Sequence, residues 1–226
     1  MIDSETVKKT AEKSGADLCG IAPVERFDGA PVGFRPQDIY PECKSVVVFA
    51  KKLPGASLFI GNCVPYTHVN SLITAEVDRM TLLISLELES LGIKNVLIPT
   101  DDPYEHWEPE RMYGRAILSL RHAGWLAGLG VLGKNTLLMN RKYGNMIQIG
   151  AILADTELEP DVLVSYEGCP EDCTICLDVC PQNALGGTTV NQQLCRPHSN
   201  FITDKGYTLK LCNLCRSECP LALGID

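Results

Sequence analysis

Most of the cysteines in this chain are gathered in its last quarter, and this clustering limits what the chain can fold into more than any other feature. Of 11 cysteines in 226 residues, eight follow residue 168, whereas residues 64–168 contain none. The N-terminus has no apolar signal region, so we expect a cytoplasmic protein in a reducing compartment. There, clustered thiols indicate metal ligation rather than a disulfide framework. The eight are Cys169, Cys173, Cys176, Cys180, Cys195, Cys212, Cys215 and Cys219.

The spacing of these cysteines predicts two iron–sulfur clusters. A Cys-x2-Cys-x3-Cys-Pro unit ends at Pro181 and again at Pro220. In the bacterial ferredoxin run C-x2-C-x2-C-x3-C-P, the fourth cysteine ligates the other cluster of the pair. Eight thiolates match two [4Fe–4S] clusters, although Cys169 and Cys173 are separated by three residues and not two. The prediction is crossed ligation: one cluster on Cys169, Cys173, Cys176 and Cys219, the other on Cys180, Cys195, Cys212 and Cys215.

Two alternatives remain for the cysteine-rich segment. Paired Cys-x2-Cys motifs also occur in zinc sites, and a bound metal can act as a purely structural staple. Two units that share a fourth ligand favour the iron–sulfur interpretation. Of the other cysteines, Cys19 lies in an apolar, strand-like run and is expected in the core. Cys43 and Cys63 lie in loop-like sequence, and a third metal site made from them is an alternative.

Residues 1–155 predict an α+β domain, followed by a double-cluster, ferredoxin-like domain over 156–226. The boundary is placed where the sequence becomes acidic and loses its periodicity, between Asp155 and Gly168. Apolar residues at helical spacing and short apolar, β-branched runs define the elements of the first domain. We expect helices over about 3–15, 70–91 and 109–123, strands over 18–22, 45–50 and 95–99, and a hairpin of 136–140 with 146–153.

The charge distribution disfavours nucleic acid and membrane partners. The formal net charge is −8, and seven acidic residues without a Lys or Arg fall between Asp155 and Asp172. Such a surface repels phosphate backbones, so tRNA is not expected to bind, whereas a basic partner protein would be attracted. The longest uncharged stretch, from Leu53 to Ala75, contains too many Pro, Gly and Asn residues for a membrane span.

A glycine-rich segment precedes the cysteines without being a nucleotide site. Residues 128–133 match G-x-G-x-x-G, but that fingerprint requires a strand before it and a helix after it. Here we expect a helix before these residues and a strand after them. The glycines instead indicate a tight turn that lets the backbone approach another element or a flat ligand.

The same segment resembles the core of epoxyqueuosine reductases. The resemblance rests on residues 125–136 (WLAGLGVLGKNT), followed by Tyr143-Gly144 and 149–153, with weaker similarity at 15–22 and 44–48. It covers about residues 1–222. It implies a nitroreductase-like or cobalamin-reductase-like α+β domain, related to reductive dehalogenases. It also implies a base-off corrinoid (cobalamin) between that domain and the nearer cluster. We place the corrinoid contacts at Gly133, Lys134, Asn135 and Thr136, with local turn stabilisation as the alternative.

The chain departs from that family at two places. The family removes an epoxide oxygen from a modified tRNA base with an acid in a G-x-D-Y-H-like segment before the long helix, and residues 64–70 here contain no acid. Tyr66 and His68 are the candidate proton donors, with helix capping and core packing as the alternative for Tyr66. The family also continues into a tRNA-contacting region, whereas this chain ends six residues after Pro220, so we expect a short form.

Two functions from different classes follow. The first is a corrinoid- and iron–sulfur-dependent oxidoreductase that takes electrons from a donor such as a ferredoxin or flavodoxin. The alternative is a ferredoxin-like electron-transfer protein that reduces an acceptor protein, without a corrinoid of its own. The discriminating feature is the first domain, because a simple ferredoxin does not need 155 additional residues with a buried core.

Overall fold

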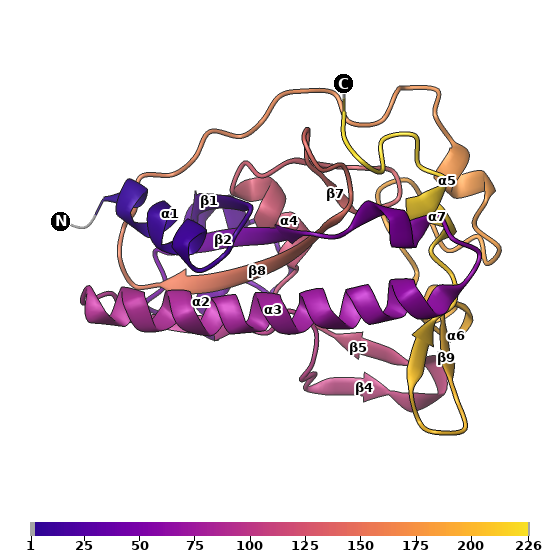
Figure 1. Ribbon diagram of the computed structural model, residues 1–226. Coiled ribbons are helices and arrows are strands. Elements are labelled where there is room, and N and C mark those ends of the chain that lie inside the picture. Colours follow the sequence, from indigo (N-terminus) through magenta and orange to yellow (C-terminus); the bar gives the residue numbers. More distant parts are fainter. Residues whose placement is uncertain (1–2, 226) are drawn as a thin grey trace.

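The computed structural model describes residues 3–225, and a four-stranded antiparallel sheet lies at its centre (Figure 1). Strands β2 and β8 occupy the middle, with β1 beside β2 and β3 beside β8. The two middle strands are buried along almost their whole length. Because both of their faces are covered, their sequences are continuous apolar runs and not alternating ones. The strands are β1 (Leu18–Pro23), β2 (Ser45–Lys52), β3 (Asn95–Ile98) and β8 (Ile147–Ala154).

Successive side chains of β2 divide the core into two clusters, one on each face of the sheet. Val47 and Phe49 pack with residues of α1 and α3. Val46 and Val48 point the other way and pack with residues of α4 and of the connection from β1 to β2. Figure 1 shows α3 running the length of the sheet. These elements are α1 (Ser4–Lys13), η1 (Val24–Phe27), α2 (Pro36–Ile39), η2 (Gly55–Leu58), α3 (Cys63–Ser90) and α4 (Leu120–Leu126).

Helix α3 begins seven residues before the position predicted from its apolar spacing. Asn62 caps it by accepting a hydrogen bond from the Val64 N–H, and Pro65 is tolerated in the first turn, where helical N–H groups have no partner. The predicted stop is confirmed, since the helix ends at Ser90 and Gly92 adopts a positive φ of 85°. The early start places Tyr66 and His68 on the helix instead of in a preceding loop.

The helix predicted over residues 109–123 is wrong. In its place stand a short hairpin, a 3₁₀ turn and then the shorter helix α4. Met112 has a φ of 46°, outside the right-handed helical region. A helix that begins at Pro109 therefore cannot continue through this residue. The hairpin pairs β4 (His106–Glu108) with β5 (Tyr113–Arg115) around η3 (Pro109–Arg111).

The hairpin predicted from residues 136–140 and 146–153 is also wrong. Strand β7 (Leu138–Met139) pairs backwards with β6 (Val131–Leu132), while β8 joins the central sheet. This pairing requires a glycine at position 130, because a Cβ there would clash with the Met139 carbonyl oxygen, 2.3 Å away. Only the bridge between Asn140 and Gly144 connects the two sides of the predicted turn.

The C-terminal segment folds back onto the first part of the chain. Residues 155–168 contain no helix or strand and run along the outside of the molecule (Figure 1). Asp161 anchors them, accepting a hydrogen bond from the Ile21 N–H and pairing with Lys8 at 2.6 Å. Ala222 shares a core cluster with Tyr66 and Met146. The remaining elements are α5 (Ile175–Asp178), α6 (Gln192–Ser199), β9 (Asn200–Ile202), β10 (Thr208–Lys210) and α7 (Leu214–Ser217).

The predicted domain boundary at residue 155 stays a prediction. Residues from both sides of this boundary pack in one buried cluster. Within residues 3–225, no helix combines the length and apolar character needed to cross a membrane.

Candidate functional site

The eight C-terminal cysteines lie in two groups of four. Burial raises the pKa of Cys176, and the nearby thiols of Cys169, Cys219 and Cys173 raise it further. Burial likewise raises the pKa of Cys215, to about 12, with further contributions from three other cysteines. Thiols influence each other in this way only when they are neighbours. We call Cys169, Cys173, Cys176 and Cys219 the outer set, and Cys180, Cys195, Cys212 and Cys215 the cavity set.

The membership of these sets coincides with the crossed arrangement expected from the spacing, while ligation itself stays a prediction. Each set consists of thiols alone, the donor chemistry of a [4Fe–4S] cluster. Among residues 3–225, no three side chains of the metal-ligand type converge as closely as the ligands of a single ion. A [4Fe–4S] cluster takes one thiolate at each of four irons and therefore needs a wider cage. Cys19 lies in β1 and packs against the core, Cys43 is buried, and Cys63 begins α3.

Residues 133–136 connect the two sets. The Lys134 backbone N–H donates to Cys169 Sγ at 3.2 Å, and its ammonium donates to the carbonyl oxygens of Pro170, Glu171 and Cys173. The Asn135 side chain is buried and donates to the Cys215 carbonyl oxygen at 2.9 Å. These two side chains therefore fasten the loops of the outer set and the cavity set to the same turn.

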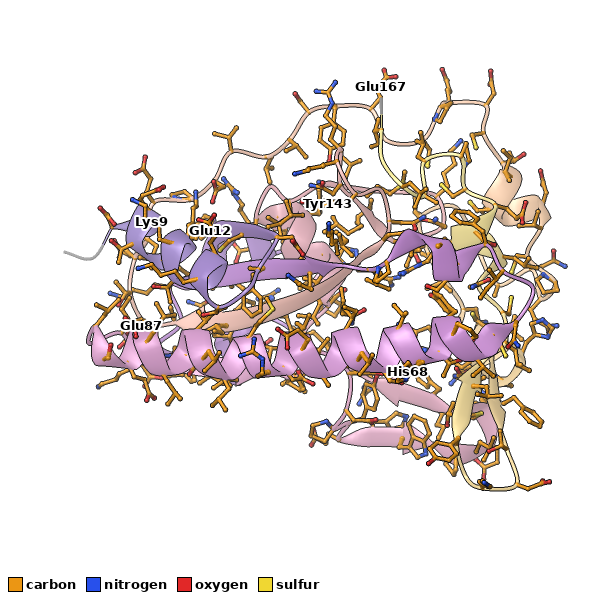
Figure 2. The ribbon with its side chains drawn as sticks, viewed as in Figure 1. Lys9, Glu12, His68, Glu87, Tyr143 and Glu167 are labelled. Carbon is orange, nitrogen blue, oxygen red and sulfur yellow. The ribbon has the colours of Figure 1, made fainter. Side chains whose placement is uncertain are left out.

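A cavity of about 920 Å³ lies between the first part of the chain and the cavity set. All four cysteines of that set line it, and the described residues of the outer set do not. Of the predicted site residues, the structure brings Tyr66, Asn135 and Thr136 to this cavity. Tyr66 is buried there. His68 is exposed on the surface of α3 (Figure 2), and neither it nor Gly133 or Lys134 lines the cavity.

Three buried polar side chains in the cavity wall have no hydrogen-bond partner. They are Thr100 Oγ1, both polar atoms of the Asn145 amide, and Asn200 Oδ1. Leaving such a group unpaired costs roughly 1–3 kcal/mol, so these positions match a polar ligand better than an apolar one. A corrinoid, whose rim carries amide side chains, is a ligand of this chemistry. The volume is near the upper end of the usual range for ligand cavities, about 300–1,000 Å³.

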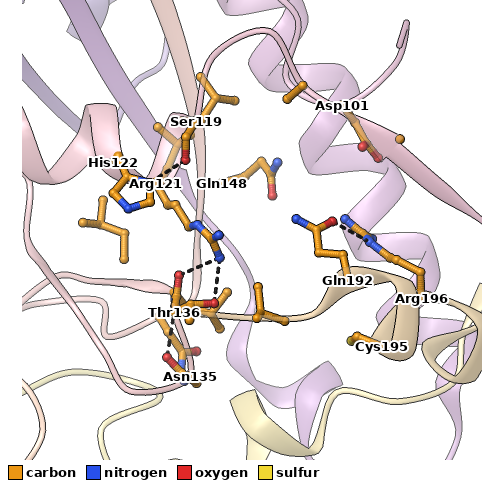
Figure 3. A pocket seen from close by; sticks show the side chains of 18 of the residues that line it. Asp101, Ser119, Arg121, His122, Asn135, Thr136, Gln148, Gln192, Cys195 and Arg196 are labelled. Atoms are coloured by element: carbon orange, nitrogen blue, oxygen red, sulfur yellow. Dashed lines mark hydrogen bonds between the residues drawn. The ribbon is translucent and has the colours of Figure 1, made fainter. Parts of the chain in front are cut away.

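Basic side chains contribute a second group of functional candidates that the sequence did not reveal. Arg121 on α4 donates through Nη1 to the carbonyl oxygen and to Oγ1 of Thr136, at 3.2 and 2.6 Å. Arg196 on α6 and Lys210 on β10 line the same cavity. Figure 3 shows Arg121 on one side of this space and Gln192 with Arg196 on the other. They come from separate elements, so no local spacing connects them; the only signal is that Arg196 follows Cys195.

Among the titratable groups that line the cavity, His122 and Tyr104 have shifted pKa values. Burial lowers the pKa of His122, and the neighbouring Arg121 lowers it further, so this imidazole is neutral at pH 7. Its Nδ1 lies 2.7 Å from the Ser119 hydroxyl. Burial raises the pKa of Tyr104, as does the hydrogen bond that its hydroxyl donates to Asp101. Both pairs leave neutral hydrogen-bonding groups at the cavity wall.

The chain is similar in sequence to epoxyqueuosine reductases, although no family model matches it. It is 34% identical to the enzyme of Lactococcus garvieae over 110 residues, which is 44% of this chain and 31% of that protein. It is 35% identical to the enzyme of Staphylococcus aureus over 132 residues, which is 53% of this chain and 33% of that protein. The chain thus spans about a third of the length of the curated relatives it matches.

Solved structures show the same mixed α/β fold. The epoxyqueuosine reductase of Streptococcus thermophilus aligns with a TM-score of 0.67 and 22% identity, over 100% of this chain and 68% of that one. The catabolic reductive dehalogenase NpRdhA aligns with a TM-score of 0.65 and 15% identity, over 86% of this chain and 29% of that one. The chain therefore resembles epoxyqueuosine reductases in sequence and shares its fold with them and with reductive dehalogenases.

Proposed function

We propose that this chain is an iron–sulfur reductase that passes electrons through two [4Fe–4S] clusters to a corrinoid in the cavity, and from there to a substrate. One observation carries the proposal: the cavity set of cysteines lines the same cavity as Tyr66 and the unpartnered amide of Asn145. A cluster held by these cysteines, a proton source at Tyr66 and the amide that would bind the ligand would therefore share one space. Their proximity is the arrangement that reductive chemistry requires.

The cysteine sets would differ in their roles. The cavity set would hold the cluster nearest the substrate, and the outer set the cluster that meets an electron donor such as a ferredoxin or flavodoxin. One N–H···S hydrogen bond is available to each set, from Lys134 to Cys169 and from Ala184 to Cys180, at 3.2 and 3.3 Å. Such bonds tune cluster potentials. The acidic residues 155–172 adjoin the outer set in sequence and would attract a basic face of the donor.

The cavity wall would hold the corrinoid through hydrogen bonds. The amides of Asn145 and Asn200 and the hydroxyl of Thr100 are buried and unpartnered, and amide groups on a corrinoid rim can both donate to them and accept from them. When bound, a corrinoid supplies a cobalt centre able to deliver electrons to a reducible bond. The part of the chain is to hold that ligand, exclude water and supply a proton.

Tyr66 is the proposed proton donor. It is buried, lies on α3 and lines the cavity, whereas His68 does not reach it. A tyrosine hydroxyl can act as a general acid if it is positioned at the reacting atom. The hydroxyl would protonate the leaving group or the reduced carbon of the substrate.

The proposed substrate is a small molecule with a reducible bond to carbon. One solved epoxyqueuosine reductase structure holds a modified tRNA stem loop, and one NpRdhA structure holds 3-bromo-4-hydroxybenzoic acid. The net charge of −8 and the acidic stretch disfavour tRNA for this chain. We therefore propose small epoxides and halogenated aromatics as the substrate classes to test, beginning with that bromobenzoate.

Anaerobic electron paramagnetic resonance of the iron-loaded protein tests this function. Titration with cob(II)alamin should convert the cobalt signal to the base-off form at about one equivalent. An unchanged base-on signal beside reducible clusters would overturn the corrinoid part, and would favour an electron-transfer protein that reduces a separate acceptor. A protein that binds zinc and no iron would overturn both.

A further inference from the structure

Three basic side chains from three separate elements line the cavity without a carboxylate partner. We call Arg121, Arg196 and Lys210 the basic triad. Each is half-buried and lines the cavity. Among the ion pairs of residues 3–225, none involves a member of the triad. Burial lowers the pKa of Arg121 and of Lys210, and in both cases the charge of Arg196 lowers it further. Arg196 is thus close enough to Arg121 and to Lys210 to repel both.

The triad is held in place by the fold. Both hydrogen bonds of Arg121 to Thr136 use Nη1, so the outer part of the guanidinium fork is left for a ligand. Arg196 Nε donates to Gln192 Oε1 at 3.4 Å. The Lys210 backbone N–H donates to Thr67 Oγ1 at 2.9 Å, which fastens β10 to α3 beside Tyr66. Figure 3 shows Arg121 and Arg196 facing the same space from opposite sides.

The members of the triad reach the cavity from different directions. Arg196 adjoins the cavity set, because it directly follows Cys195 in the sequence. Arg121 and Lys210 line the same cavity from α4 and β10.

The other ionisable groups around the triad do not neutralise it. Of the described residues that line the cavity, Asp101 alone carries a carboxylate, and it accepts the hydrogen bond of the Tyr104 hydroxyl. Asp101 and Asp102 raise the pKa of Lys210, but less than burial and Arg196 lower it. His122 is neutral at pH 7. In a chain with a net charge of −8, this excess of desolvated cations needs an anion to offset it.

We propose that the basic triad binds the carboxylate or phosphate group of an anionic ligand and holds that ligand beside Tyr66. Two forked guanidinium groups and one ammonium match the oxygens of such a group. Asn200 lies directly opposite Lys210 in the β9–β10 register, and its unpartnered Oδ1 can accept a hydrogen bond from a donor group elsewhere on the same ligand. The anion can belong to the substrate or to the phosphodiester in the nucleotide tail of cobalamin. The proposal rests on the proposed function for its reaction, but not for anion binding itself.

Calorimetric titration of the iron-loaded, corrinoid-free protein with inorganic phosphate and with benzoate, at low ionic strength, tests the site. The variants are Arg121→Gln and Lys210→Gln, and Lys210→Arg preserves the charge. Lys205→Gln is the matched control, because Lys205 is exposed on the same hairpin and does not line the cavity. We expect each Gln variant to weaken binding of at least one anion about tenfold or more. Lys210→Arg and Lys205→Gln should stay close to the unchanged protein. Iron content shows whether each variant has folded.

A second arm identifies the source of the anion. Cob(II)alamin is compared with cob(II)inamide, which lacks the phosphate-bearing tail. If the tail supplies the anion, the Gln variants lose affinity for cobalamin alone, and bound cobalamin blocks phosphate. If the substrate supplies it, both corrinoids bind equally to all variants and phosphate still binds beside them.

Two outcomes would overturn the proposal. One is failure of the unchanged protein to bind either anion, with equal corrinoid binding by all variants. The other is a shift of the cluster potential in the Gln variants without any loss of anion or cobalamin binding, which would make the triad a counter-charge for the clusters. The phosphate arm needs no corrinoid, so a chain that binds no cobalamin would overturn the proposed function and leave this result standing.

Discussion

The two cysteine sets share a repeated spacing but have different surroundings. The outer set is fastened by Lys134, which bonds both the sulfur of Cys169 and the following carbonyls, and it adjoins the exposed Glu171. The cavity set lies beside Arg196, and burial raises the pKa of Cys215 to about 12. A local motif therefore predicts the metal ligands, whereas the surrounding fold decides which set lines the cavity.

The long spacing within the second motif accounts for the difference. Between Cys195 and Cys212 the chain forms the end of α6 and the β9–β10 hairpin. This insertion contributes Arg196, Asn200 and Lys210 to the cavity wall. The outer set has only a short loop between Cys169 and Cys176, and a loop of that length cannot build a wall. What looks like an irregularity in the motif is the segment that builds one wall of the cavity.

The largest effect is expected when a cysteine is removed from the cavity set. Cys180→Ala should eliminate the cluster next to the cavity and spare the other, so iron should fall from about eight to about four atoms per chain. The reason is that Cys180 follows the outer-set cysteines in sequence but adjoins Cys195 and Cys215 in space. Iron analysis measures the iron content of the unchanged protein and of the variant. Electron paramagnetic resonance detects the remaining cluster.

Cys43→Ala is the matched control, because Cys43 is buried away from both sets, with its thiol donating to the Ser45 carbonyl oxygen. Its iron content should not change. Loss of the outer cluster alone in Cys180→Ala would contradict crossed ligation, and the two sets would then follow the order of the sequence.

Removing the proposed proton donor should have the next largest effect. Tyr66→Phe should slow reductive turnover about 100-fold, the lower end of the range for a general acid, and leave both clusters intact. Turnover is measured as bromide release from 3-bromo-4-hydroxybenzoic acid under a strong reductant with cobalamin. Tyr207→Phe is the control, because Tyr207 is 68% exposed. Equal turnover in Tyr66→Phe and the control would remove Tyr66 from the mechanism.

The sequence predicted those parts of the molecule whose causes are local. The buried strands β2 and β8 follow from continuous apolar runs. The ligand sets of the two clusters stay a prediction from the spacing. The start of α3 was missed because Cys63–Val69 combines a proline with polar side chains and shows no apolar stripe. The helix over 109–123 failed because a positive φ at Met112 cannot be inferred from its neighbours.

The cavity was not predictable, since its polar groups belong to separate elements. Asn145 precedes β8 and Asn200 begins β9, and each looks like an ordinary surface residue in sequence. Only the tertiary fold buries them together and leaves their side-chain atoms unpartnered. Lys134 and Asn135 were singled out as corrinoid contacts, and the structure shows their side chains bonded to the cysteine loops.

A moderate effect is expected at the unpartnered amide. Asn145→Leu should weaken cob(II)alamin binding about tenfold, the loss of roughly 1–1.5 kcal/mol of hydrogen bonding. Its melting temperature should be equal or higher, because an apolar side chain of similar shape replaces a buried, unpaired polar group. Asn95→Leu is the matched contrast, since Asn95 bonds Ser85 and lies away from the cavity. It should lose stability and keep its corrinoid affinity. If Asn145→Leu instead lost stability and kept its corrinoid affinity, Asn145 would have only a structural role.

The smallest effect is expected at the link to the outer set. Lys134→Met removes an ammonium that donates to three carbonyl oxygens of the outer loop, but its backbone bond to Cys169 remains. Part of the ammonium is exposed, so water replaces some of these bonds, and we expect no more than about a tenfold faster loss of the outer cluster to a chelator. The cavity cluster should be unaffected. Lys142→Met is the control, because the ammonium of that exposed lysine lies over the Tyr143 ring. Equal loss of both clusters would mean that residues 133–136 support the two sets as one unit, and the contrast between a separately fastened outer set and the cavity set would have to be abandoned.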